Sequence, residues 1–180
     1  INLGGTGFDT GIPLTALTEG GPHRVSITVD TASNELVFYI DGEAVFTGTG
    51  NAIAGNPAGG TLIFGQEQDE VGGGFQTSDI LIGEVGDIRI WDDVRTAEEV
   101  VQNAFVEFAN AGGQDGLVAN WQADKATPAE LVDLVGGPAM AVQNAAPIVN
   151  ELIPGDGVLA ADAVAQEVTV TTQVVDQQGD

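Results

Sequence analysis

Residues 65–79 read G-Q-E-Q-D-E-V-G-G-G-F-Q-T-S-D and run directly into I-L-I-G-E-V-G-D-I-R-I-W-D-D-V. The flanking segments, 61–65 and 80–91, are apolar and rich in β-branched residues, which predicts two strands. The three adjacent glycines at 72–74 allow backbone conformations that turn the chain back on itself. The stretch is therefore expected to form a glycine-rich loop between two strands.

This loop concentrates side chains that carry oxygen atoms. Ca²⁺ prefers six to eight oxygen ligands at roughly 2.3–2.6 Å. Carboxylates this close in sequence repel one another unless a cation lies between them. The candidate ligands are Glu67, Gln68, Asp69, Gln76 and Asp79. The sequence therefore predicts that the loop binds Ca²⁺, with the glycines bringing Gln76 and Asp79 towards Glu67.

The loop resembles the calcium loop of the pentraxins. That family carries G-Q-E-Q-D, then G-G-x-F, then a glycine and an acidic residue ahead of W-D. Here the same elements are residues 65–69, 73–75, Gly83-Glu84 and Trp91-Asp92. A looser likeness to the wider laminin-G-like group extends over residues 1–142. The resemblance implies an all-β, antiparallel two-sheet jelly-roll sandwich of the concanavalin A-like type, with one short helix.

The resemblance also implies roles for the loop residues. Glu67 and Asp69 are expected to bridge two calcium ions, Gln68 to offer its backbone carbonyl, and Gln76 and Asp79 to complete the outer ion. In the family an acid usually precedes a glutamine at the last two positions, so the charge is exchanged between them here. Pentraxins take further ligands, an Asp-Asn pair, from a strand well upstream. We expect those ligands and the first strands of the jelly roll to precede Ile1.

The amino-acid composition excludes some classes of function. The net charge is −23, with only four Lys and Arg residues, which excludes nonspecific nucleic-acid binding because that needs a basic surface. Such acidity suits a salty medium or the binding of cations. No apolar run reaches 18 residues, so we expect no membrane insertion. Cysteine is absent, and His23-Arg24-Val25 stands where animal pentraxins carry H-x-C, which favours a bacterial surface protein.

The remaining elements follow from local patterns. Alternation predicts strands at 23–30 and 35–40, and Asp41-Gly42 predicts a hairpin into 44–47. Residues 49–60 are expected to be a loop. Thr96 and Glu99 form a capping-box pattern that opens a helix, with Val101, Phe105 and Phe108 at helical spacing before Gly112-Gly113. Further strands are expected at 117–122 and 139–143. The domain is expected to span 1–145, and 146–180 to be a linker and the start of a following β domain.

Catalysis is a remote alternative function for this chain. A glycoside hydrolase of this fold class would carry E-x-D-x-x-E on a strand, but Gly72 stands at the third acid of the match that begins at Glu67, so we expect no enzyme. His23 is the only histidine and is expected to pack at a strand end. Trp91 and Trp121 are expected to be core residues, although each is able to stack on a sugar.

The sequence therefore favours an extracellular, calcium-dependent, lectin-like module of an adhesin. Its ligand would be a carbohydrate or a phosphorylated group, presented with neighbouring domains of a larger surface protein. The alternative is a spacer domain that calcium rigidifies and that binds no ligand.

Overall fold

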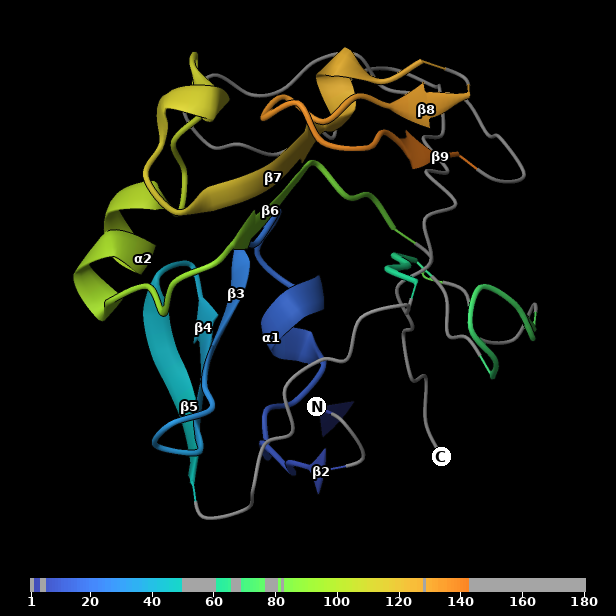
Figure 1. Ribbon diagram of the computed structural model, residues 1–180. Helices are drawn as coiled ribbons and strands as arrows, with labels where there is room; N and C mark the ends of the chain where they lie inside the picture. Colours follow the sequence, from blue (N-terminus) through green and yellow to red (C-terminus); the bar gives the residue numbers. More distant parts are fainter. Residues whose placement is uncertain are drawn as a thin grey trace. The chain divides into compact units, whose positions relative to one another are not determined.

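The computed structural model describes residues 2–3, 6–49, 61–65, 69–76, 81, 83–127 and 129–142 (Figure 1). The chain divides into two compact units. The first comprises Ile1–Pro57 with Trp91–Glu107, and the second comprises Ala58–Ile90 with Phe108–Asp180. Each unit is described by itself. The expected linker and following domain at 146–180, and most of the expected loop at 49–60, lie outside the described residues.

The first unit contains an antiparallel sheet of three strands in the order β3-β4-β5. The strands are β3 (Val25–Asp30), β4 (Glu35–Ile40) and β5 (Glu43–Thr49). The β3–β4 turn has Asn34 at φ 56°, and the β4–β5 turn has Asp41 at φ 54° followed by Gly42 at φ 87°. Positive φ at both central residues is what a two-residue hairpin requires, which confirms the hairpin predicted from Asp41-Gly42.

Short elements precede this sheet. Strand β1 (Asn2–Leu3) pairs with β2 (Thr6–Gly7), and α1 (Thr15–Thr18) is a single helical turn that the sequence did not predict. The turn is held by local backbone bonds such as Glu19 N to Thr15 O at 3.1 Å.

The core of the first unit lies on one face of this sheet. Leu36 and Phe38 are buried together with Phe8, and Ile12, Val29, Ile40 and Phe46 pack against them. The Phe8 and Phe46 rings meet edge to face, with centroids 6.4 Å apart. Gly48 is required beneath them, because a Cβ there would lie 2.5 Å from the Phe8 ring.

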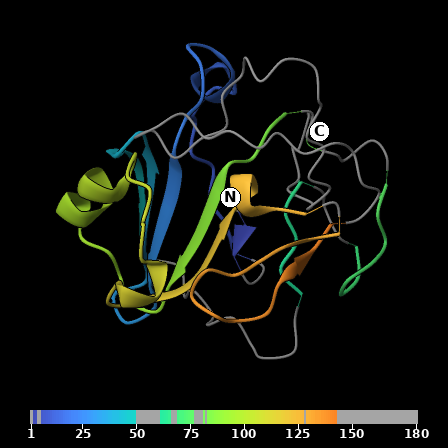
Figure 2. The same cartoon turned by 90° about the horizontal axis from the view of Figure 1, so that it is seen from above.

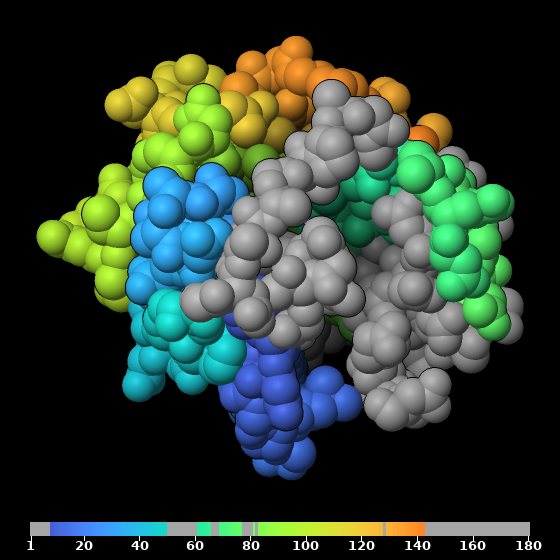
Figure 3. Space-filling view, turned by 60° about the horizontal axis from the view of Figure 1, so that its bottom comes forward, coloured from blue at the N-terminus to red at the C-terminus, as the bar shows by residue number. Residues whose placement is uncertain are grey.

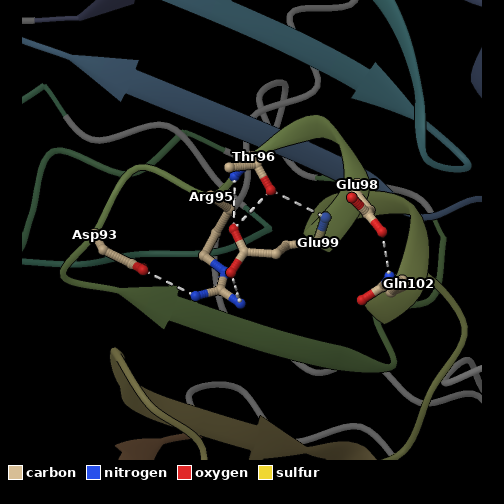
Figure 4. Close-up of polar contacts among 6 residues, drawn as sticks. All are labelled: Asp93, Arg95, Thr96, Glu98, Glu99 and Gln102. Carbon is tan, nitrogen blue, oxygen red and sulfur yellow. Dashed lines mark hydrogen bonds and ion pairs between the residues drawn. The ribbon is translucent and has the colours of Figure 1, made fainter.

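Helix α2 (Ala97–Asn103) begins with the expected capping box (Figure 4). The Thr96 side chain accepts from Glu99 N at 3.3 Å, and the Glu99 carboxylate accepts from Thr96 N at 2.8 Å. The helix lies beside β5 (Figures 1 and 2). Its C-terminal boundary and its buried face were predicted wrongly. The helix ends at Asn103, so Phe105 and Phe108 are not on it.

The buried residue of α2 is Val100, and the Ala104 that follows the helix is also buried, whereas Val101 is 59% exposed. Val101 nevertheless approaches the β4–β5 turn, since a Cβ on Gly42 would lie 3.1 Å from the Val101 Cα. Gly42 is therefore both the turn residue and the point of closest approach to the helix.

The second unit is built on β6 (Asp87–Trp91), which extends to the boundary between the units, and β7 (Leu117–Gln122). Shorter elements complete it: the antiparallel pair β8 (Glu130–Leu131) and β9 (Met140–Ala141), and 3₁₀ turns at Ala111–Gly113 and Ala123–Lys125. Its core contains Ile88, Ala119, Trp121 and Leu131. The strand expected at 80–91 begins only at Asp87, and residues 83–86, which include Gly83 and Gly86, are not in strand conformation.

The pairs β1–β2, β3–β4, β4–β5 and β8–β9 are antiparallel, and α2 is the one helix longer than a single turn among the described residues. The predicted fold class, all-β and antiparallel with one short helix, is confirmed.

Candidate metal centre

The two ends of the candidate loop lie together in the second unit. The Leu81 N–H donates to the Gly65 carbonyl at 2.8 Å, and Gly65 has φ 84°. This backbone bond joins the two ends of the segment across fifteen intervening residues. The strand predicted at 61–65 was wrong, because residues 61–64 are not in strand conformation and Gly65 forms only an isolated bridge.

A tight turn forms the described part of this loop, residues 69–76. Glu70 and Gly73 exchange backbone hydrogen bonds, at 2.9 Å from Gly73 N and 3.4 Å from Glu70 N. Gly72 and Gly74 have φ 71° and 76°, which side chains rarely adopt. A Cβ on Gly74 would lie 2.6 Å from the Asp69 Cβ. The glycines therefore let the chain return past Asp69, whereas the predicted approach of Gln76 and Asp79 to Glu67 falls outside the described residues.

The turn brings two of the predicted ligands together. Gln76 Nε2 donates to Asp69 Oδ2 at 3.1 Å, and both residues are exposed at the surface, where 69–76 is visible in the space-filling view (Figure 3). Rotating the Gln76 amide by half a turn presents its oxygen in place of its nitrogen. Asp69 and Gln76 then offer two oxygens to one hard cation, which is the donor chemistry that Ca²⁺ requires.

The other predicted ligands, Glu67, Gln68 and Asp79, lie outside the described residues. Within the described part of the chain, no group of three or more His, Cys, Asp or Glu side chains is placed to hold a metal ion. Of the predicted ligands, the described residues therefore bring together only Asp69 and Gln76.

Basic side chains do not contribute to the loop. All four Lys and Arg residues and the one His are described, and each is held elsewhere. Arg89 pairs with Asp87, Lys125 with Asp124, and Arg95 with Asp93 and Glu99. Arg24 Nε donates to the Ala104 carbonyl at 2.7 Å, and His23 contacts Asp41 at 2.7 Å. The acidic loop therefore has no cationic side chain among these contacts to neutralise it.

The tryptophans serve the fold. Trp121 is 7% exposed in the second core, and its Nε1 donates to the Pro138 carbonyl at 3.3 Å. Trp91 is half-buried, and the Arg95 guanidinium lies 4.1 Å from its ring centroid. Trp121 is the core residue that the sequence predicted. Arg95 covers one face of Trp91, which leaves that face closed to a sugar.

One polar cluster was not foreseen from the sequence. Asn120 Nδ2 donates to Asp87 Oδ1 at 2.6 Å and to the Ile88 carbonyl at 3.2 Å, and Gln122 Nε2 donates to Asn120 Oδ1 at 3.2 Å. Asn120 and Gln122 are fully buried. The signal was available, because Asp87 and Arg89 alternate with Ile88 and Ile90, but the alternation normally predicts a solvated face.

No helix among the described residues has the length and apolar character to cross a bilayer.

Comparison with known proteins identifies relatives of this chain. The pentaxin family matches residues 14–127, which include the whole candidate loop. Human pentraxin-4 is 32% identical over 120 residues, covering 59% of this chain and 24% of the relative. Serum amyloid P-component from Cavia porcellus is 29% identical over 126 residues, covering 68% of this chain and 52% of the relative. Neuronal pentraxin-2 from Mus musculus is 38% identical over 90 residues, covering 49% and 21%.

The chain thus spans between about a fifth and about half of the length of these relatives. No solved structure matches it significantly. The bacterial source expected above stays a prediction. The family match agrees with the concanavalin A-like fold class that the loop implied. Because the matched region exceeds half of the chain, this protein belongs to the pentaxin family.

Proposed function

We propose that this chain is a calcium-dependent ligand-binding module. The observation that carries the proposal is the contact of Asp69 with Gln76 across the glycine turn, at 3.1 Å. This contact lies inside the region matched by the pentaxin family. In the proposal, Glu67 and Asp79 add carboxylate oxygens and Gln68 adds its backbone carbonyl to the same calcium site.

The ligand would reach the protein through the cation. The net charge is −23, and the basic side chains are held by internal acceptors, so an anion meets a repulsive surface. A bound Ca²⁺ reverses the sign locally and leaves coordination positions for ligand oxygens. The ligand class is therefore a phosphorylated group or a pair of carbohydrate hydroxyls. The module would act outside the cell, at the cell surface, beside other domains of an adhesin.

Binding is favoured over catalysis. His23 has both ring nitrogens within hydrogen-bond distance of oxygen atoms, Asp41 Oδ2 and the Glu19 carbonyl, so it serves structure. Among the described residues, Asp69 is joined by an amide and not by a second acid of a glycosidase pair. We propose that the chain is not an enzyme.

Calorimetric titration of the full chain with CaCl₂ tests the metal site. We expect Asp69→Ala to abolish most of the binding, because it removes one of the two described ligands. Asp115→Ala is the matched control, since Asp115 is an exposed acid outside the loop. Extracellular modules typically bind Ca²⁺ with dissociation constants of about 10⁻⁴–10⁻³ M. Binding that is equal in the wild type and in Asp69→Ala contradicts the site.

The ligand is tested next, on a glycan array and on immobilised phosphomonoesters. We expect retention in CaCl₂ that is lost in chelator and restored by added calcium. Retention that persists in chelator contradicts a calcium-mediated function. If calcium binds and raises the melting temperature but nothing on either surface is retained, the ligand-free spacer is the better account.

A further inference from the structure

The single histidine joins two segments of the first unit that lie far apart in sequence. Its Nδ1 is 2.7 Å from Asp41 Oδ2, in the β4–β5 turn, and its Nε2 is 2.9 Å from the Glu19 carbonyl, just after α1. The His23 side chain is 17% exposed. The imidazole therefore bridges an acidic side chain and a backbone carbonyl while half-buried.

Both of these partners accept hydrogen bonds and neither donates. A neutral imidazole carries one N–H, so in this geometry one of its nitrogens would face an acceptor with a lone pair. The protonated ring carries two N–H groups and satisfies both partners. The hydrogen bond to Asp41 raises the pKa of His23 above its usual 6.5. The hydrogen bond to the Glu19 carbonyl and the attraction of the Asp41 charge act in the same direction, against the opposing effect of burial.

The backbone on each side is shaped for this contact. Gly20 and Gly21 have φ 97° and 112°, which lets residues 19–23 form a short loop that returns the Glu19 carbonyl to the His23 ring. On the other side, Asp41 Oδ1 accepts from Arg24 N at 2.8 Å, and Asp41 N donates to the Arg24 carbonyl at 2.8 Å. The Asp41 carboxylate therefore stays in place whether or not the ring is charged.

The charged groups near the ring are few. Asp41 faces it from the β4–β5 turn. The neighbouring Arg24 turns its guanidinium away, to the Ala104 carbonyl beyond α2, at 2.7 Å. Glu19 and Glu43 are exposed residues on the two flanking segments. The charge that acts directly on the ring is thus the single negative charge of Asp41.

We propose that His23 is a proton-controlled clasp, closed when its ring carries two protons, that fastens the loop of residues 19–23 to the β4–β5 turn. Below the ordinary titration range of histidine the clasp is closed. As the pH rises through the folded-state pKa of His23 the ring loses a proton, the bond to one partner is lost, and the 19–23 loop is released. Because the folded-state pKa of His23 is raised, the stabilisation by the clasp is complete below about pH 6.5 and declines as the pH rises above it.

The first test is a nuclear magnetic resonance titration of the His23 imidazole in the full chain. The chain has one histidine, so its ring signals are assigned without ambiguity. We expect a midpoint above 6.5 in the wild type and a lower midpoint in Asp41→Asn. Asparagine tolerates the positive φ of Asp41 and keeps an oxygen for Arg24 N, so the turn survives.

Asp30→Asn is the matched control. Asp30 is also a turn aspartate that accepts backbone N–H groups, from Ala32 and Ser33, but it does not touch His23. We expect its midpoint to equal that of the wild type. A wild-type midpoint at or below 6.5, or equal midpoints in the wild type and Asp41→Asn, overturns the proposal.

Hydrogen exchange measures whether deprotonation of His23 releases the loop of residues 19–23. After correction for the intrinsic pH dependence of exchange, protection of the Glu19 amide, which donates to the Thr15 carbonyl where the loop begins, should fall by up to about tenfold per pH unit between pH 6.5 and the His23 midpoint. In His23→Gln the same amide should be less protected and show no inflection. Protection that is independent of pH in the wild type overturns the clasp even where the ring titrates as expected.

Discussion

The carboxylate of Asp133 and the backbone N–H of Asn120 are joined by a 2.9 Å hydrogen bond across thirteen positions of the chain. The same carboxylate accepts from Val135 N at 3.0 Å and from Gly137 N at 2.9 Å, and Asp133 is 4% exposed. One buried side chain thus shapes the 133–137 turn and attaches it to β7. Its three donors are backbone groups, so no neighbouring side chain replaces it.

Asp133→Ala should therefore be strongly destabilising. It leaves three backbone N–H groups without their partner, and an unsatisfied buried donor costs about 1–3 kcal/mol. We expect a loss of about 3 kcal/mol or more in urea unfolding, with Asp133→Asn in between because it keeps one oxygen. Asp115→Ala is the control. A change within about 0.5 kcal/mol for Asp133→Ala would contradict this account.

Gly74→Ala should weaken calcium binding without touching a ligand atom. The new Cβ would lie 2.6 Å from the Asp69 Cβ at a φ of 76°, so Asp69 must move. Gly112→Ala is the matched control, because a Cβ there meets nothing within 4 Å and its φ is not in the positive region. Calorimetric titration with CaCl₂ should give a weaker affinity for Gly74→Ala alone. Equal affinities for the two variants would show that the Asp69 position does not matter.

The stabilisation of α2 by its capping box should depend on pH. The bonds from Thr96 lower the pKa of Glu99 below its usual value, with its backbone N–H contributing most. Since the folded pKa is depressed, the stabilisation is present above about pH 4.5 and is lost as the pH falls through the folded pKa. After correction for the intrinsic pH dependence of exchange, amide exchange at residues 97–100 should rise in acid. Glu99→Gln should remove that rise, and a Glu98→Gln control should keep it.

Thr96→Ala should cost about 1 kcal/mol, because it removes the side chain that caps the Glu99 amide. Chemical unfolding measures this loss. Thr18→Ala provides a comparison, since the Thr18 hydroxyl only reaches the Leu14 carbonyl at 3.4 Å in an exposed turn. Equal stabilities for these two variants would contradict the role of the cap.

Leu36→Ala should cost about 2–5 kcal/mol, because Leu36 is 0% exposed and lies at the centre of the first core. Leu62 is 49% exposed, so Leu62→Ala is the same chemical change outside a core and should cost far less. Urea unfolding of both variants makes the comparison. Similar losses would mean that the core is not centred on β4.

Local signals decided which elements were predictable. The Asp41-Gly42 turn and the Thr96–Glu99 box each work within four residues, so the sequence was sufficient for both. The end of α2 was not, because Phe105 and Phe108 keep helical spacing although the helix stops at Asn103. Phe108 instead packs under the Arg89 guanidinium, 4.1 Å from the ring centroid, a contact that depends on the tertiary structure.

In the second unit, too, contacts between residues close in sequence were predictable and contacts between distant residues were not. The glycine turn and the approach of Gln76 to Asp69 were foreseeable, because they arise within eight residues of chain. The buried polar face of β6 and β7 was not, because Asp87 and Asn120 meet over 33 positions. Alternation along a strand reveals two faces but not which of them is covered.

Every basic side chain contacts an acceptor within the chain, and this affects how closely copies of the protein approach one another. Two copies of this chain meet as bodies of like sign, and neither offers the other a free counter-charge from lysine or arginine. Copies packed on a surface should therefore stand apart at low ionic strength, where the screening length is about 30 Å at 0.01 M, and approach as salt shortens it. The spacing of such a layer would be set by the ions around it more than by contacts between neighbours.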